Sequence, residues 1–151
     1  MQLILNLPPY TDARIKKNNE GLFIFDILRR KYVALTPEEW VRQNFINYLI
    51  KFKGYSPTLM NNEVKLTLNG MTRRCDSILY SQNMLPKMII EYKSPNIKIT
   101  QKVFDQISRY NIILKVDYLI ITNGLEHYCC QIDYKKNSYI FLEDIPHYNT
   151  L

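Results

Sequence analysis

The feature that most constrains the fold is a short run at residues 87–93, which is strongly apolar between Lys87 and its charged last positions. Its length and its apolar character predict a central strand, because a strand covered on both faces has no polar side. Apolar residues then recur at helical spacing over residues 100–114, with Thr100 as the expected cap, and a second buried strand follows at 117–122. This order predicts two parallel strands joined by a right-handed crossover. We therefore expect an α/β fold with a mixed sheet.

A first helix is predicted to begin directly after Thr36 and to end at Gly54. Thr36 is a suitable N-cap, Pro37 fits the first helical position, and Glu39 has the spacing that closes a capping box. Apolar residues then repeat at helical spacing, which predicts that one stripe of the helix packs on the sheet. The members of this stripe are Val41, Phe45, Tyr48, Leu49 and Phe52.

Two hairpins and a group of N-terminal strands complete the predicted core. The Asn69-Gly70 pair predicts a hairpin between residues 63–68 and 72–80, because this dipeptide favours a two-residue turn. A last hairpin is expected over residues 127–142, and residues 14–35 are expected to form strands that resemble an antiparallel entry to a sheet. The 151 residues therefore predict one domain, 1–151, with N-terminal strands in 1–35, a core in 36–142 and a tail in 143–151.

Composition narrows the function only slightly. The 20 basic and 14 acidic residues give a net charge of +6, which favours polyanionic partners without identifying one. The chain contains no apolar run of membrane-spanning length and no secretory signal, so we expect a cytoplasmic protein without a membrane partner. Cys75, Cys129 and Cys130 are odd in number and two are adjacent, so we expect buried thiols rather than a disulfide framework.

The chemistry is expected at the charged end of the central strand. Glu91 and Lys93 project from one face because side chains alternate along a strand, whereas Tyr92 points the other way. Asp76 lies on the preceding strand and can come alongside. Two carboxylates repel unless they bind a cation, and Mg²⁺ favours hard oxygen ligands, with Mn²⁺ as a substitute. Asp76, Glu91 and the carbonyl of Tyr92 are the expected metal ligands, while Lys93 would orient the attacking water or stabilise charge in the transition state.

The simpler alternative is a Glu-Lys pair that ends a strand, with Asp76 as an unrelated surface residue. A glutamate and a lysine at this spacing are common by chance, so the surrounding residues must decide. Glu38 continues the apolar stripe of the first helix toward the sheet and could reach a metal-bound water. It could equally be an ordinary first-turn carboxylate that stabilises the helix dipole.

Further candidates lie on the second helix and near the strand ends. Gln106 and Tyr110 are four residues apart, so they share one helix face beside the predicted site. Tyr110 could also be a core aromatic residue with its hydroxyl at the edge. Four basic residues flank the site at positions suited to phosphate contacts, although each could be an ordinary surface residue. They are Arg73, Arg74, Lys98 and Lys102.

With these residues in place, the chain resembles the N-terminal nuclease domain of the type I restriction enzyme R subunit, in the PD-(D/E)XK nuclease superfamily. The segments that carry the resemblance are residues 36–43, 74–78, 89–95, 101–110 and 121–124. The resemblance implies a restriction-endonuclease-like core, in which helices flank a mixed central sheet, here with extra N-terminal strands. It also implies an active-site triad of Asp76, Glu91 and Lys93, with Glu38 as the acid of the first helix. Gln106 and Tyr110 match the QxxxY motif that is associated with nuclease function in R subunits.

The resemblance has a limit, because R subunits continue into helicase motor domains. No GxxxxGK[ST] loop occurs in this chain, which excludes translocation by the chain itself. A stand-alone protein and a fragment that works with other subunits both remain open, and the hairpin and tail at the C-terminal end slightly favour a complete small protein.

Three functions are therefore weighed. The leading hypothesis is a Mg²⁺-dependent DNA endonuclease, with other restriction-system subunits as candidate partners. The second is a non-catalytic DNA-binding or assembly module of a restriction or defence complex. The third is a nuclease that acts on RNA or branched DNA. No recognition helix or base-reading module is identifiable, so the sequence assigns no specificity.

Overall fold

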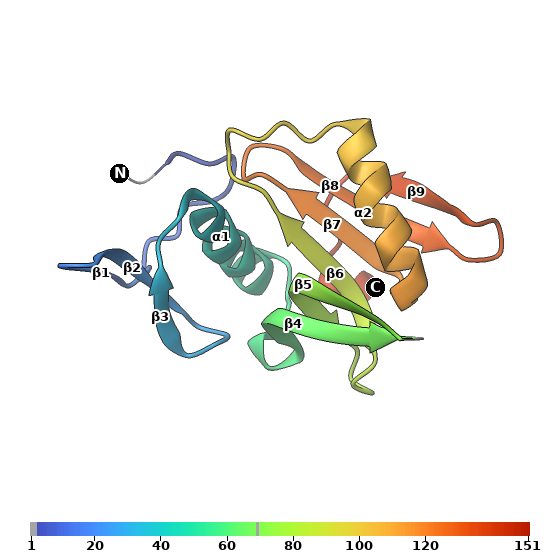
Figure 1. The fold of residues 1–151 in the computed structure, drawn as a ribbon, viewed down its shortest axis with the longest axis horizontal. Coiled ribbons are helices and arrows are strands. Elements are labelled where there is room, and N and C mark those ends of the chain that lie inside the picture. Colours follow the sequence, from blue (N-terminus) through green and yellow to red (C-terminus); the bar gives the residue numbers. More distant parts are fainter. Residues whose placement is uncertain (1–2, 69) are drawn as a thin grey trace.

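The computed structural model describes residues 3–68 and 70–151, without the side chains at positions 68 and 109–114 (Figure 1). Its described elements are two sheets, two α-helices and two short 3₁₀ helices. In chain order they are β1 (Ile15–Asn18), β2 (Gly21–Asp26), β3 (Lys31–Ala34), α1 (Pro37–Phe52), η1 (Pro57–Leu59), β4 (Met60–Leu68), β5 (Met71–Tyr80), β6 (Pro86–Tyr92), α2 (Gln101–Leu114), β7 (Tyr118–Thr122), β8 (His127–Asp133), β9 (Ser138–Leu142) and η2 (Tyr148–Thr150).

The central sheet is mixed, as the sequence predicts. Its strands lie in the order β4-β5-β6-β7-β8-β9. Only β6 and β7 are parallel among these neighbours, and α2 connects them, while the other pairs are antiparallel. The strand, helix and strand arrangement predicted from the apolar run is therefore confirmed, with β6 and β7 in the middle of the sheet.

The two helices cover opposite faces of this sheet. On one face, Ile90 and Tyr92 of β6 belong to an apolar cluster with Val41 and Phe45 of α1. On the other face, Ile89 belongs to a cluster with Phe104 and Ile107 of α2. Successive side chains of a strand point to opposite faces. Glu91 therefore projects from β6 toward the face covered by α2, and Tyr92 projects toward the face covered by α1.

The N-terminal strands form a sheet of their own. β1, β2 and β3 pair only with one another, in an antiparallel sheet beside α1 (Figure 1). The antiparallel N-terminal strands expected over residues 14–35 are therefore present, and in the described structure they form a sheet separate from β4–β9. Alternation of side chains along a segment predicts a strand, but it does not say with which sheet or strand that segment pairs. Here the side chain of Asn62 on β4 donates a hydrogen bond to Asp26 on β2, 2.9 Å away, and joins the two sheets.

Helix α1 begins where the sequence predicts, but its capping box is incomplete. The backbone N–H of Glu39 donates to Oγ1 of Thr36 at 3.0 Å, as expected of an N-cap. The Glu39 carboxylate does not return to Thr36, because it accepts from Arg29 at 2.6 Å instead. The apolar stripe is buried at its centre, whereas Phe52 is 54% exposed at the end of the helix.

The structure also bears on the state of the cysteines and on the length and polarity of the helices. All three cysteines are free and buried. Among the described residues, neither helix is long and apolar enough to cross a bilayer.

Candidate active site

Strand register brings Asp76 beside Glu91. Ser77 pairs with Ile90 across the antiparallel β5 and β6 strands, and Asp76 and Glu91 are the next residues beyond this pair, with their carboxyls within hydrogen-bonding reach of each other. The side chain of Asp76 is fixed there, because the backbone N–H of Tyr92 donates to its Oδ2 at 2.9 Å. The predicted proximity of the aspartate to the glutamate strand is therefore present in the structure.

Glu91 is a buried carboxyl, with 7% of its surface exposed. Burial raises its pKa to about 8, and the negative charge of Asp76 and a hydrogen bond with that carboxyl add to the effect. Arg73 opposes the rise, since its Nη2 donates to Oε1 of Glu91 at 2.8 Å. The pair consequently favours either a shared proton or a bound cation over two free charges.

Lys93 and Glu38 lie at the edge of this carboxyl pair. Lys93 follows the last residue of β6, is partly buried, and donates its backbone N–H to the Thr122 carbonyl at 2.9 Å. Glu38 lies in the first turn of α1, where partial desolvation and the charge of Asp76 raise its pKa while Lys93 lowers it. Glu38 and Lys93 are therefore close enough to Asp76 and to each other to interact electrostatically.

The second-helix residues are not joined to this group by any described contact. Gln106 is exposed on α2, and the contacts of the described residues do not link it to Asp76, Glu91 or Lys93. Tyr110 has a side chain outside the described part of the structure. The expected amide and phenol face therefore remains a prediction.

The four basic residues predicted to contact phosphate differ in their surroundings. Arg73 forms the ion pair with Glu91, so it belongs to the carboxyl site itself. Arg74 pairs with Glu63 at 2.5 Å and keeps an exposed side chain. Lys98 and Lys102 are exposed. Nothing in the sequence distinguished Arg73 from Arg74, because only the fold decides which one reaches Glu91.

A buried polar chain behind the site was missed from sequence. The hydroxyl of Tyr92 donates to Ser77 Oγ at 2.9 Å, and Ser77 Oγ donates to Asn62 Oδ1 at 2.5 Å. Asn62 in turn donates to Asp26, which is fully buried. Ser77 and Tyr92 are the immediate neighbours of Asp76, Glu91 and Lys93, so these bonds hold both strand backbones in place. Polar strand residues of this kind look like surface residues in a sequence.

The family follows from the sequence match. Residues 37–146 match the family described as type I restriction enzyme R protein N terminus (HSDR_N). The chain belongs to this family. The matched residues contain α1, the whole central sheet and every member of the carboxyl site. The three N-terminal strands lie outside the match.

A solved structure has the same fold. It is a fragment described as an HsdR subunit of a type I restriction enzyme from Vibrio vulnificus YJ016, with a TM-score of 0.53 and 21% sequence identity. The match covers 76% of the present chain but only 24% of that chain. No curated protein matches the sequence. The two chains therefore share a fold. The shared part makes up 24% of the Vibrio chain.

The donor set suits a hard divalent cation. Among the described residues, no group of three or more His, Cys, Asp and Glu side chains is arranged to hold a metal. Mg²⁺ does not need such a cage, because it is usually bound through one or two carboxylates and keeps several waters. The raised pKa of Glu91 shows that a negative charge on this buried carboxyl is unfavourable beside Asp76. A bound cation would offset that repulsion. Asp76 and Glu91 thus fit the ion in both chemistry and charge.

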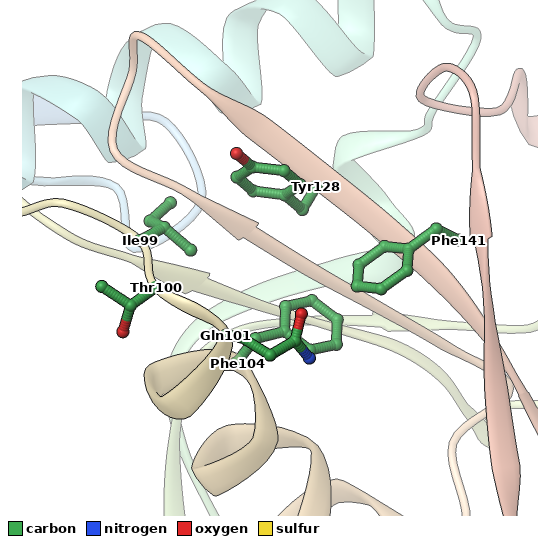
Figure 2. Close-up of a pocket in the computed structure, with 6 residues that line it drawn as sticks. All are labelled: Ile99, Thr100, Gln101, Phe104, Tyr128 and Phe141. Carbon is green, nitrogen blue, oxygen red and sulfur yellow. The ribbon is translucent and has the colours of Figure 1, made fainter.

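Figure 2 shows a separate pocket, about 120 Å³ in volume, between the start of α2 and the β8–β9 hairpin. Aromatic rings of Phe104, Tyr128 and Phe141 surround it. Its lining contains no carboxylate and no lysine, and β7 separates its strands from β5 and β6. The pocket is therefore not part of the carboxyl site.

The carboxyl pair predicts a pH dependence of stability without metal. In EDTA, the free energy of unfolding should fall as the pH rises from the unfolded pKa of Glu91, about 4.3, to its folded pKa of about 8. The sign follows because a raised folded-state pKa stabilises the protein below the unfolded pKa, and this contribution is lost as pH rises through the folded one. We expect a loss on the order of 1 kcal/mol or more.

Urea unfolding at a series of pH values measures this loss. Glu91→Gln should flatten the dependence, because glutamine cannot ionise. Glu143→Gln changes an exposed glutamate and should keep the parental slope. Identical slopes for the parent and Glu91→Gln would show that the pKa of Glu91 is not raised in the folded protein.

Proposed function

We propose that this chain is a Mg²⁺-dependent nuclease that hydrolyses phosphodiester bonds in DNA. The observation that carries the proposal is the close approach of two carboxyls, Asp76 on β5 and Glu91 on β6, with Lys93 directly after the end of β6. The family supports the same reading, since its members form the N terminus of a restriction enzyme subunit. The net charge of +6 is compatible with a polyanionic substrate.

Each residue has a proposed role. Asp76 and Glu91 would hold the ion with the Tyr92 carbonyl, and Mn²⁺ could replace Mg²⁺. The bound ion would lower the pKa of a water and stabilise charge on the phosphate. Asp76 is oriented for this role by the Tyr92 N–H, and Arg73 keeps the Glu91 carboxyl in place.

The remaining residues would act around this centre. Lys93 would orient the attacking water or stabilise negative charge in the transition state. Glu38 would hold a water at the edge of the site. Gln106 and Tyr110 would face the substrate from α2, and Arg74, Lys98 and Lys102 would contact phosphates.

Other restriction-system subunits are the proposed protein partners. The solved relative is named as a subunit of a type I restriction enzyme, and the present chain matches 24% of its length. A domain of this size would then supply cleavage while other parts of the system supply specificity and movement.

Plasmid cleavage tests the proposal directly. The parent protein should nick or linearise plasmid DNA with Mg²⁺ and should not do so in EDTA. Asp76→Ala should abolish cleavage, because it removes the carboxylate held by Tyr92. Asp117→Ala is the matched control, since Asp117 forms a partly exposed pair with Lys87 outside the site, and it should remain active. Equal cleavage by the parent and Asp76→Ala would discard the metal site.

A second function, a non-catalytic DNA-binding or assembly module, is favoured by one observation. The Arg73–Glu91 ion pair already places one positive charge beside the carboxyls, which partly replaces the charge that a metal would supply. Calorimetry separates the two functions. Heat of Mn²⁺ binding that disappears in Asp76→Ala supports the nuclease, whereas salt-dependent DNA binding without metal uptake supports the module. Parallel assays with RNA and branched DNA would identify a different substrate.

A further inference from the structure

The outer face of the N-terminal sheet combines basic and aromatic side chains. Lys16 pairs with Phe23 across β1 and β2, and Phe25 pairs with Tyr32 across β2 and β3. Arg14 adjoins Phe25, because its carbonyl accepts the Phe25 N–H at 2.8 Å. We call these five residues the basic–aromatic face. Alternation along β2 places Ile24 and Asp26, both fully buried, on the opposite side.

The cations of this face lie directly over its rings. The Arg14 guanidinium carbon is 3.8 Å from the centroid of Phe25, and Nζ of Lys16 is 4.1 Å from the centroid of Tyr32. Phe25 and Tyr32 meet edge to face, with centroids 5.3 Å apart. The three rings of the face belong to neither of the two apolar clusters described for this chain, and Tyr32 is 37% exposed. The rings therefore form a surface platform rather than part of a core.

The charge of this face is not neutralised within the described structure. Arg29, Arg42 and Arg73 each form an ion pair with a carboxylate. Arg14 and Lys16 form none among the described contacts. The nearby exposed acids are Glu20 and Asp12, and Asp12 is paired with Lys51. Lys17 and Lys31 are also exposed, but they pair with Leu22 and Asp26 and so lie on the other side of the sheet, while Arg30 is exposed in the turn before β3. The sheet consequently presents a net positive surface.

We propose that the basic–aromatic face binds a single strand of DNA, with bases stacked on its rings and phosphates held by its cations. Sequence-tolerant single-strand binding uses this combination, because every base has a flat face and every nucleotide a phosphate. A base can stack on the outer plane of the Arg14 guanidinium, or take the place of the exposed Lys16 side chain on Tyr32 while the ammonium moves to a phosphate. Duplex DNA suits the face less well, since its base faces are covered by stacking.

This surface lies beyond the family match, which begins at residue 37. It also lies at the far end of the molecule from the β8–β9 hairpin (Figure 1). The inference therefore rests neither on the family nor on catalysis by the carboxyl site. It would give the proposed nuclease a separate surface that holds a displaced or unpaired strand.

Fluorescence anisotropy with a fluorescein-labelled single-stranded oligonucleotide of mixed sequence tests the proposal. All measurements are made in EDTA, so that failure of the proposed catalysis does not affect them. Tyr32→Ala should weaken binding by about fivefold or more, because base stacking on an aromatic ring contributes roughly 1–3 kcal/mol. Tyr32→Phe keeps the ring and should bind like the parent. Loss of binding in Tyr32→Ala with retention in Tyr32→Phe is the expected pair of results.

A second variant tests the cations. Replacing Arg14 and Lys16 together by glutamine should weaken binding and lower the slope of log affinity against log salt by roughly 1.4, about 0.7 for each phosphate contact. The matched control replaces Lys135 and Lys136 by glutamine, in the exposed turn between β8 and β9, and has the same change in net charge. Equal losses in the two double variants, unchanged binding by Tyr32→Ala, or an equal loss of duplex binding in Tyr32→Ala would each overturn the proposal.

Discussion

Replacing Lys93 with methionine is expected to lower the kcat of the proposed DNA cleavage by about 10³-fold, because it removes the positive charge that we propose acts at the reacting phosphate. The ammonium group follows directly on the strand that carries Glu91, and it is close enough to lower the pKa of Glu38. Methionine keeps the length and much of the apolar stem of lysine, so packing should change little. Single-turnover cleavage of plasmid DNA with saturating Mg²⁺ measures the effect.

Two comparisons separate a catalytic loss from a structural one. Lys93→Met should take up Mn²⁺ in calorimetry as well as the parent does, because Asp76 and Glu91 are the proposed ligands. Lys135→Met changes an exposed lysine in the β8–β9 turn and should leave kcat unaltered. Full activity in Lys93→Met would remove the lysine from the mechanism, and a parallel loss of Mn²⁺ uptake would assign it a structural role.

Asp26→Ala is expected to lower the free energy of unfolding by about 3–5 kcal/mol, because it leaves buried partners without their acceptor. Asp26 is fully buried and accepts hydrogen bonds from Asn62, from the Arg29 side chain and from two backbone N–H groups. Burial alone would raise its pKa, but these bonds hold the pKa below its usual value. Urea unfolding at neutral pH measures the change.

The pH dependence of this variant supplies a second test. Since the folded-state pKa of Asp26 is lowered, its contribution is present above the unfolded pKa of about 3.9 and is lost as pH falls through the folded value. The difference between the parent and Asp26→Ala should therefore shrink in acid. Asp12→Ala removes an exposed aspartate near the same sheet and should leave stability close to the parental value. Similar stabilities of Asp12→Ala and Asp26→Ala would contradict the buried network.

The sequence by itself determined the elements and the central pair of strands. Continuous apolar character at residues 88–90, a helical repeat and a second buried run are local patterns, and local patterns report burial and period directly. Thr36 and Pro37 marked the start of α1 in the same way, because a helix end leaves N–H groups that specific residues satisfy. Alternation also predicts that Glu91 and Lys93 share one face, and in the structure Lys93 directly follows the end of β6.

Only the tertiary structure decided how these elements meet. It showed that β1–β3 form a separate sheet, that Glu39 binds Arg29 rather than closing its cap, and that Arg73 rather than Arg74 reaches Glu91. It also revealed the chain of bonds from Tyr92 to Asp26. Each of these depends on contacts between residues far apart in sequence, whose partners are set by strand register and sheet edge, and periodicity along one segment carries no information about either.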